Sequence, residues 1–300
     1  MKQVVLITGA NGMLAKQLAK QLENEYSVRF LTRKKTQSNE YLWDLNNHYI
    51  DPNALIGVHN IIHLAGASIA NKRWTKKRKQ IILSSRVDSA DLILKELKKH
   101  QISIETFISA SAIGYYGTKT SDDILHEKSP KGNDFLSDVC GKWENAAYDF
   151  KLNGLANRVA ILRIGIILAK NDGALKRIMH PIKYGLGSGI GAGKQYMPWI
   201  HIHDLVRIFK LILDDKRITG TFNAVSPQHI NNMELTKAIA QLTNKPLLLP
   251  NIPKFILQVL FGEMSAILLE GSKISSEKIM NAGFRFEYEK LSDALRYFET

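Results

Sequence analysis

The sequence has little of several things, and each scarcity excludes a class of protein. Cys140 is the one cysteine in 300 residues, so an intrachain disulfide and a cysteine-rich metal site are both excluded. No apolar run approaches the ~20 residues that a membrane-spanning helix needs. The stretch 1–7 is too short for the apolar region of a signal peptide and leads directly into a glycine-rich turn. We therefore expect a cytoplasmic protein with no membrane segment and no membrane partner.

Acidic residues are scarce relative to basic ones. The chain has 28 Asp and Glu against 41 Lys and Arg, which gives a formal net charge of +13. This excess suits nucleic acid or a membrane surface, but it equally suits an anionic cofactor and substrate. The densest basic segment, 71–79 (NKRWTKKRK), includes a tryptophan, as a nucleic-acid patch would. No recognisable nucleic-acid module surrounds it, so a solvated helix start is favoured and nucleic acid is disfavoured.

The N-terminal region carries the most informative pattern in the chain. Val4–Thr8 is a short, β-branched apolar run of the kind that forms a buried parallel strand. Gly9, Gly12 and Ala15 follow at the spacing G-x-x-G-x-x-A, and an amphipathic helix and a second strand at 27–32 come next. Small residues in such a turn let the backbone approach a diphosphate at the helix N-terminus. The flanking strands favour a dinucleotide site over an ordinary glycine-rich turn.

The end of the second expected strand indicates which dinucleotide binds. A site for NAD usually places an acidic residue there, where it accepts hydrogen bonds from the ribose hydroxyls. This chain has Arg33, Lys34 and Lys35 instead, and its next acid is Glu40. A charged hydrogen bond to a 2′-phosphate contributes roughly 1.5–3 kcal/mol, which favours NADP over NAD by about tenfold to a hundredfold. The sequence therefore predicts NADP(H) as cofactor, with a solvated basic loop as the alternative.

Other cofactor contacts are expected where further strands end. Asp44 closes a short apolar stretch at 41–45, and a strand at 60–64 runs into the small residues Ala65 and Gly66. A parallel sheet places such residues beneath a bound ligand, although a plain tight turn uses them too. The predicted cofactor-binding set is Thr8, Gly9, Asn11, Gly12, Met13, Leu14, Arg33, Asp44, Leu45, Leu64, Ala65 and Gly66.

Helices and strands then alternate along the chain. Helix 81–99, strand 106–111, helix 134–151 and strand 157–168 succeed one another. This order implies an α/β fold with a doubly wound parallel sheet of the Rossmann type. Arg163 interrupts the last apolar strand, and an arginine buried there needs an anion or a carboxylate as partner.

The pattern changes after residue 168. The segment 184–193 holds five glycines and predicts either a mobile lid or a plain hairpin. A strand-like run with two histidines follows at 198–204, but too few other ligands lie near it for a metal site. We expect an NADP-binding Rossmann domain over 1–168, with 199–225 returning to it, and a smaller C-terminal α+β substrate lobe made of 169–198 and 226–300.

Several short motifs together resemble a known family. They are TGANG at 8–12, HLAG at 63–66, SRV at 85–87, SASAIGYYG at 109–117, FLSDVCGKWE at 135–144, PWIHIHD at 198–204, GE at 262–263 and GFRF at 283–286. The combination is similar to the atypical extended short-chain dehydrogenase/reductases, the sugar-nucleotide-epimerase-like branch called epimerase family proteins. The resemblance runs nearly end to end. It implies an NADP-binding Rossmann domain, a smaller C-terminal lobe and a substrate cleft between them.

The resemblance also implies where the chemistry takes place. The parent family uses a serine and a helical Tyr-x-x-x-Lys pair, whose tyrosine exchanges a proton with the substrate while hydride moves to or from the nicotinamide. Ser111 matches the serine, but Cys140 stands at the tyrosine position and Glu144 at the lysine position. A carboxylate raises the pKa of a neighbouring thiol, so Cys140 is favoured as a small buried hydrophobic residue over an acid. Glu144 can still accept hydrogen bonds from ribose hydroxyls.

Other side chains are candidates for the missing proton transfer, which typically contributes about 10²–10⁴ in rate. Tyr115 and Tyr116 follow the serine strand, and His201 is a further titratable group beside the lobe. Arg86 and Arg163 suit a phosphate or carboxylate, or else structural ion pairs. The predicted catalytic set is Ser111, Tyr116, Cys140, Glu144 and His201; the predicted substrate-binding set is Arg86, Tyr115, Arg163 and Trp199; no metal is expected.

Two functions from different classes follow from these residues. The first is an NADP(H)-dependent oxidoreductase or epimerase acting on a small polar molecule, with nucleotide sugars among the candidates. The second is a non-catalytic NADP(H)-binding sensor or interaction protein, because the usual proton-transfer pair is replaced. Extended members of the superfamily often pair through two outer helices, so a homodimer through 81–99 and 134–151 is a further expectation.

Overall fold

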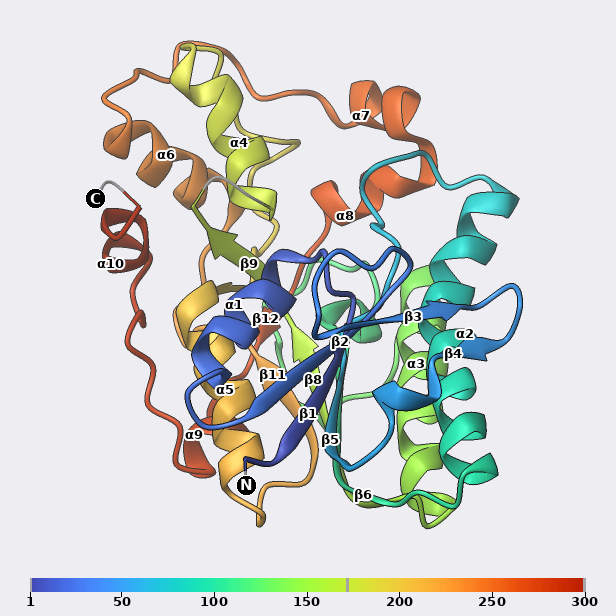
Figure 1. Cartoon of the computed structure of the whole chain (residues 1–300). Coiled ribbons are helices and arrows are strands. Elements are labelled where there is room, and N and C mark those ends of the chain that lie inside the picture. Colours follow the sequence, from blue (N-terminus) through green and yellow to red (C-terminus); the bar gives the residue numbers. More distant parts are fainter. Residues whose placement is uncertain (1, 171–172, 299–300) are drawn as a thin grey trace.

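The structure, a computed structural model, describes residues 2–170 and 173–298. Its centre is an eight-stranded sheet in the order β11-β8-β6-β5-β1-β2-β3-β4 (Figure 1). Every neighbouring pair is parallel except β3 and β4, which are antiparallel. The strands are β1 (Val4–Thr8), β2 (Ser27–Thr32), β3 (Glu40–Asp44), β4 (Tyr49–Ile50), β5 (Val58–His63), β6 (Ile104–Ala112), β8 (Ala156–Ile164) and β11 (Gly220–Ala224).

Helices cover both faces of this sheet, which is why most side chains of its central strands are buried and many are apolar. On one face α1 (Met13–Leu22) contacts α5 (Ile202–Asp214), and on the other α2 (Lys76–Lys99) contacts α3 (Phe135–Leu152). Each face has its own hydrophobic core: Leu18 and Phe209 lie in one, and Phe107 and Phe150 stack in the other. The predicted doubly wound Rossmann-type fold is confirmed.

A smaller lobe stands beyond the carboxyl ends of the strands (Figure 1). It contains α4 (Gly173–Lys183), α6 (Asn232–Leu242), α7 (Lys254–Phe261), α8 (Ala266–Leu269) and α10 (Leu291–Arg296). The short helix α9 (Glu277–Asn281) lies instead against β11 of the main sheet. Two small sheets pair β9 (Ile166–Ala169) with β10 (Trp199–His201), and β7 (Ile124–Leu125) with β12 (Lys273–Ile274). Three short 3-10 helices are η1 (Pro52–Ala54), η2 (Ile113–Tyr116) and η3 (Gly262–Ser265).

The chain leaves the main sheet after β8 and later returns to it. β9 and β10 pair with each other outside the main sheet, then α5 packs against α1 and β11 joins the free edge of β8. Within 199–225, α5 and β11 therefore lie against the main sheet, whereas β10 belongs to the small sheet. Among the helices formed by the described residues, none is both long enough and apolar enough to cross a membrane.

The glycine-rich segment 184–193 is anchored to the chain before α7. Gly191 N donates to Ile252 O at 2.9 Å, and Ile252 N donates to Gly189 O at 2.9 Å. A Cβ added at Gly189 would lie 2.5 Å from Asn251 Oδ1. Its glycines therefore allow close packing between two segments. The segment is an irregular loop that pairs with Ile252 through Ile190, so it forms no hairpin, and this anchoring does not favour a free lid.

Candidate cofactor and active site

The turn after β1 has the shape that the glycine spacing predicts. Gly9 has a φ of +76°, a conformation that side chains disfavour. A Cβ added there would also lie 3.2 Å from the carbonyl oxygen of Leu64, which follows β5. Gly12 N donates to Gly9 O at 2.8 Å and closes the turn. The backbone path therefore requires glycine at position 9, whereas Gly12 has an ordinary φ of −72° and only a tight approach, 3.1 Å from an added Cβ to Gly9 O.

The N-terminus of α1 is open. Gly12 is its N-cap residue, no side chain caps the helix, and no acidic residue stands in its first turn. The backbone N–H groups of that turn are thus left for water or a ligand, and the helix dipole favours an anion there. Asn11 is exposed, while Met13 and Leu14 are half-buried against the core. This end of α1 fits the diphosphate of a dinucleotide.

The basic residues after β2 lie at the same edge of the sheet. β2 and β1 are parallel neighbours, so Arg33, Lys34 and Lys35 follow one strand over from the glycine turn. All three are exposed, and none forms an ion pair with any described residue. The nearby acid Glu40 is already hydrogen-bonded to the protein backbone: its Oε2 accepts from Thr36 N at 2.6 Å and from Gln37 N at 3.1 Å. Those bonds hold the pKa of Glu40 below its usual value, the Thr36 backbone bond most of all.

A buried hydrogen-bond network supports the turn from below. Thr8 Oγ1 accepts from the backbone N–H groups of Leu64 and Ala65, both at 2.9 Å. Its own proton is then directed to His63 Nδ1, 3.0 Å away, which leaves the His63 Nε2–H to donate to Arg86 O at 3.1 Å. Thr8 and His63 are both fully buried. The ends of β1 and β5, where the cofactor residues were predicted, are thereby fixed to each other.

The remaining predicted cofactor residues surround the same edge. Asp44 ends β3, and its Oδ1 accepts from Asn46 N at 2.8 Å, so the carboxylate shapes the turn that contains Leu45. Gly66 is exposed beyond β5, with the guanidinium of Arg86 against it: a Cβ there would lie 3.0 Å from Arg86 Cζ. The structure thus gathers the predicted set along four adjacent strand ends.

Ser111 and Glu144 meet, as their predicted positions imply. Ser111 Oγ donates to Glu144 Oε1 at 2.7 Å. Glu144 is clamped by Arg163, whose Nε donates to Oε1 and whose Nη2 donates to Oε2, both at 2.8 Å. All three residues are buried, at 3%, 5% and 3% exposure. The carboxylate partner that buried Arg163 was predicted to need is therefore Glu144.

The two tyrosines after β6 lie against the same guanidinium. Arg163 Cζ is 3.3 Å from the centre of the Tyr115 ring, and Arg163 Nη1 donates to the Tyr116 hydroxyl at 3.1 Å. Tyr116 in turn donates to Asn223 Oδ1 at 2.6 Å. Burial raises the pKa of Tyr116 to about 12, although Arg163 works in the opposite direction. Arg163 thus already has protein acceptors, which favours the structural ion pair among the two roles that the sequence left open.

Cys140 lies one helical turn before Glu144 and is 3% exposed. Burial first, and the Glu144 carboxylate second, raise the pKa of its thiol to about 12. A thiol with that pKa stays protonated at neutral pH and neither attacks nor accepts a proton. The structure therefore places Cys140 as a buried packing residue.

The structure places His201 and Trp199 away from this cluster. His201 is fully buried, its Nδ1 accepts from His203 N at 3.3 Å to cap α5, and its ring lies 3.9 Å from that of Tyr288. Burial lowers its pKa to about 4. Trp199 is fully buried in the core of the small lobe. Both side chains are enclosed by packed protein, which does not favour the roles predicted for them.

Arg86 is likewise held by the protein. Its Nη1 donates to Ala67 O at 3.1 Å and to Ile82 O at 2.8 Å, and its guanidinium lies 5.0 Å from the Trp143 ring centre. Burial lowers its pKa to about 10, so it remains charged at neutral pH. Its guanidinium lies against Gly66, so it is next to the residues predicted to bind the cofactor.

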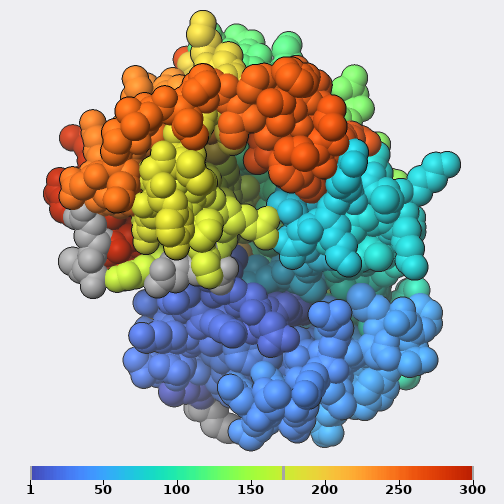
Figure 2. Space-filling view, turned by 90° about the horizontal axis from the view of Figure 1, so that it is seen from above, coloured from blue at the N-terminus to red at the C-terminus, as the bar shows by residue number. Residues whose placement is uncertain are grey.

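A hollow opens between the two lobes. Figure 2 shows it bounded by the N-terminal strand ends and α1, by the start of α2, by α4 and by the segment that includes α7. Arg177 of α4 reaches across: its Nη2 donates to Asn71 Oδ1 at 2.6 Å and its Nη1 to Ala70 O at 3.2 Å. Sequence analysis missed this bridge, because nothing in the local pattern pairs residues so far apart.

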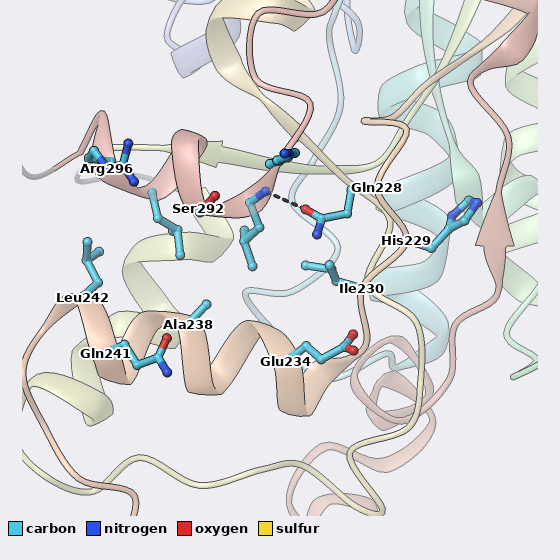
Figure 3. Close-up of a pocket in the computed structure, with 12 residues that line it drawn as sticks. Gln228, His229, Ile230, Glu234, Ala238, Gln241, Leu242, Ser292 and Arg296 are labelled. Atoms are coloured by element: carbon cyan, nitrogen blue, oxygen red, sulfur yellow. Dashed lines mark hydrogen bonds between the residues drawn. The ribbon is translucent and has the colours of Figure 1, made fainter.

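Besides a pocket of about 650 Å³ at the C-terminal end of α6, two pockets lie outside that hollow. One, of about 550 Å³, is lined by Tyr115, Glu144 and Arg163 together with Lys131 and Lys142. The other, of about 490 Å³, lies between α6 and α10, as Figure 3 shows, and contains none of the predicted site residues. Within the part of the chain that the structure describes, no group of three or more His, Cys, Asp or Glu side chains could hold a metal ion.

Comparison with known proteins agrees with this geometry. The model of the NAD dependent epimerase/dehydratase family matches residues 5–225, and a domain of unknown function, DUF1731, matches residues 252–298. An epimerase family protein of Mycobacterium leprae is 32% identical over 100% of this chain and 96% of its own length. The chloroplastic SDR39U1 homolog of Arabidopsis thaliana is 31% identical over 98% of this chain and 86% of its own.

A solved structure extends the likeness to three dimensions. The crystal structure of human epimerase family protein SDR39U1 with NADPH superposes with a TM-score of 0.87, at 27% identity and 99% coverage of both chains. The match of the family model over most of the chain and the relatives above 30% identity lead to one conclusion. The chain belongs to the NAD dependent epimerase/dehydratase family, among its epimerase family proteins.

Proposed function

We propose that this protein is an NADP(H)-dependent oxidoreductase or epimerase that acts on a small polar substrate. The observation that carries the proposal is the uncapped N-terminus of α1 beside three exposed cations with no ion pair among the described residues. A diphosphate fits the first, and a 2′-phosphate fits the second. The human relative crystallised with NADPH supports the same cofactor.

The chain's own residues divide the work with the cofactor, which when bound supplies or accepts hydride. Ser111 donates its proton to Glu144, so its lone pairs are free to accept a hydrogen bond from a substrate hydroxyl. Tyr116 is the remaining candidate for proton transfer, and it would act as a proton donor, because burial keeps its hydroxyl protonated at neutral pH although Arg163 donates to its oxygen. The pocket lined by Tyr115, Glu144 and Arg163 offers room for a polar substrate beside this cluster.

A titration with each nucleotide tests the cofactor assignment. We expect NADPH to bind more tightly than NADH, and Arg33→Ala to lose about tenfold to a hundredfold of NADPH affinity with NADH unchanged. Lys98→Ala is the control, because it removes one exposed cation from the far end of α2. Equal loss in both variants would attribute the effect to overall charge and contradict a 2′-phosphate site.

A second candidate is an NADP(H)-binding protein without catalysis. It is favoured by the bidentate Arg163–Glu144 pair and the high pKa of Cys140, which together replace the usual proton-transfer pair. An assay of NADPH oxidation with a panel of carbonyl compounds and sugar nucleotides distinguishes the enzyme from the non-catalytic protein. Turnover that Ser111→Ala abolishes supports the enzyme, whereas tight NADPH binding without turnover of any compound supports the sensor. A homodimer and a cytoplasmic location stay predictions.

A further inference from the structure

Helix α7 presents an apolar face to solvent. Of its eight residues only Leu257 is buried. Phe255 and Val259 are 64% and 70% exposed, and Ile256 and Leu260 are 37% and 57% exposed. Because each pair is four residues apart, the four side chains form one continuous stripe on the outside of the helix. A surface helix normally turns such a stripe inward, so this face lacks the partner that its composition calls for.

The exposed apolar residues of the molecule gather near this helix. Eight of the 15 exposed large hydrophobic side chains among the described residues fall within two segments, 184–186 and 248–260. The chain directly after the first segment is bonded to the second, since Ser188 Oγ donates to Pro250 O at 2.5 Å. Single exposed apolar residues need no explanation, but a concentration at one end of one lobe marks an interaction surface.

A basic segment lies directly beside α7. Lys79 pairs with Glu263 at 2.6 Å, and a Cβ added at Gly262, the residue after α7, would lie 3.0 Å from Arg73 Nη2. Figure 2 shows the start of α2 next to the α7 segment on the same face of the molecule. The exposed cations here are Lys72, Arg73, Lys76 and Lys77, and none has an ion pair in the described parts of the chain.

We propose that α7 and the basic segment 72–77 together dock this protein on an anionic lipid membrane surface. An apolar helical stripe enters the boundary between headgroups and acyl chains, while neighbouring lysines and arginines attract anionic headgroups. This is a peripheral contact, and it assigns a role to the basic run that the cofactor site does not use. It departs from the expectation, based on the absence of long apolar runs, that no membrane takes part.

The charge pattern favours a membrane over a second copy of the chain. A symmetric dimer through α7 would bring two identical sets of cations together, and like charges at an interface are unfavourable. The apolar stripe is also on a helix at the outer edge of the molecule (Figure 1), where a lipid surface can reach it. The same cations that repel a second copy attract phosphatidylglycerol.

Sedimentation with vesicles tests the docking surface. The intact protein is mixed with vesicles of phosphatidylcholine alone or of phosphatidylcholine with phosphatidylglycerol, at low and high salt. We expect it to sediment with the anionic vesicles, about fivefold more weakly for each of Lys76→Gln and Lys77→Gln, and less as salt rises. Val259→Asp should reduce binding at least tenfold. Leu152→Asp is the matched control, because Leu152 is 81% exposed at the end of α3, far from α7 in the chain.

Several results would overturn the proposal. They are the absence of sedimentation with anionic vesicles, an equal loss for Val259→Asp and Leu152→Asp, or binding that ignores both salt and headgroup charge. A dimer in light scattering that Val259→Asp converts to a monomer, without vesicle binding, would assign the surface to a second copy instead. Thermal unfolding of each variant is the folding control. A variant that unfolds at the same temperature as the unchanged protein has kept its fold, so its weaker vesicle binding is then due to the lost contact.

Discussion

At the scale of single residues, His63 shows how much one buried imidazole can connect. It joins the end of β1, through Thr8, to the carbonyl of Arg86 on α2. Burial lowers its pKa from 6.5 to about 3, with a smaller contribution from the Arg86 charge. The ring is therefore neutral in the folded protein, and its hydrogen bonds depend on that neutrality.

This lowered pKa predicts an acid-dependent loss of stability. Below pH 6.5 the unfolded chain protonates His63 while the folded chain does not until about pH 3, so the unfolded state binds more protons across that window. Stability is complete above pH 6.5 and falls with decreasing pH by up to about 1.4 kcal/mol per pH unit from this one residue. His63→Asn should show a shallower slope in urea unfolding at several pH values. Equal slopes in the two proteins would contradict the neutral, buried imidazole.

The residues predicted to be catalytic or to bind substrate show where prediction from single residues fails. The need of Arg163 for a carboxylate followed from its place in an apolar strand, and Glu144 supplies it. That His201 caps α5 and stacks on Tyr288 could not follow from its neighbours in sequence, because Tyr288 is distant in the chain. A run such as PWIHIHD gives the side-chain alternation, but which face is covered depends on a tertiary contact that the run does not encode.

At the scale of elements, the strand–turn–helix at the N-terminus was the most predictable part of the site. Val4–Thr8 as a strand matches the structure, and the following helix begins directly after Gly12. Local rules suffice here, because a tight turn with a positive φ admits few residues other than glycine. The elements of the small lobe are short and make their contacts across long sequence distances, so their pattern was only loosely predictable.

A pair of glycine substitutions tests the nucleotide turn. Gly9 and Gly57 both have positive φ, +76° and +66°, so alanine should cost each about 1–2 kcal/mol of backbone strain. Gly57 has nothing within 4 Å of an added Cβ, whereas Gly9 meets Leu64 O at 3.2 Å. We expect Gly57→Ala to bind NADPH normally and Gly9→Ala to bind at least tenfold more weakly, as measured by fluorescence titration. Similar affinities in both variants would show that the turn does not hold the cofactor.

At the scale of the whole molecule, the parallel main sheet was predictable and the small sheet of β9 and β10 was not. The alternation of helices and strands identified the doubly wound fold, because a parallel strand needs a crossover helix. The separate sheet of β9 and β10 could not be recognised in the sequence, because β9 continues the apolar run of β8 with only Gly165 between them. A Cβ at Gly165 would lie 2.6 Å from Pro198 O, so this glycine lets the chain turn away from the sheet.

The return of α5 and β11 makes the N-terminal half dependent on the rest of the chain. One of the two cores around the main sheet includes Ile200, Leu205, Phe209 and Phe222 alongside residues of β1 and α1. A fragment ending at residue 168 would lose these contacts and leave the edge of β8 unpaired, which favours aggregation. We expect it to show no cooperative thermal transition and no NADPH binding. Mixing it during refolding with a fragment of 169–300 should restore both, because the missing core residues are then supplied. A cooperative, NADPH-binding 1–168 fragment on its own would instead mean that β1–β8 and their helices form a complete cofactor domain.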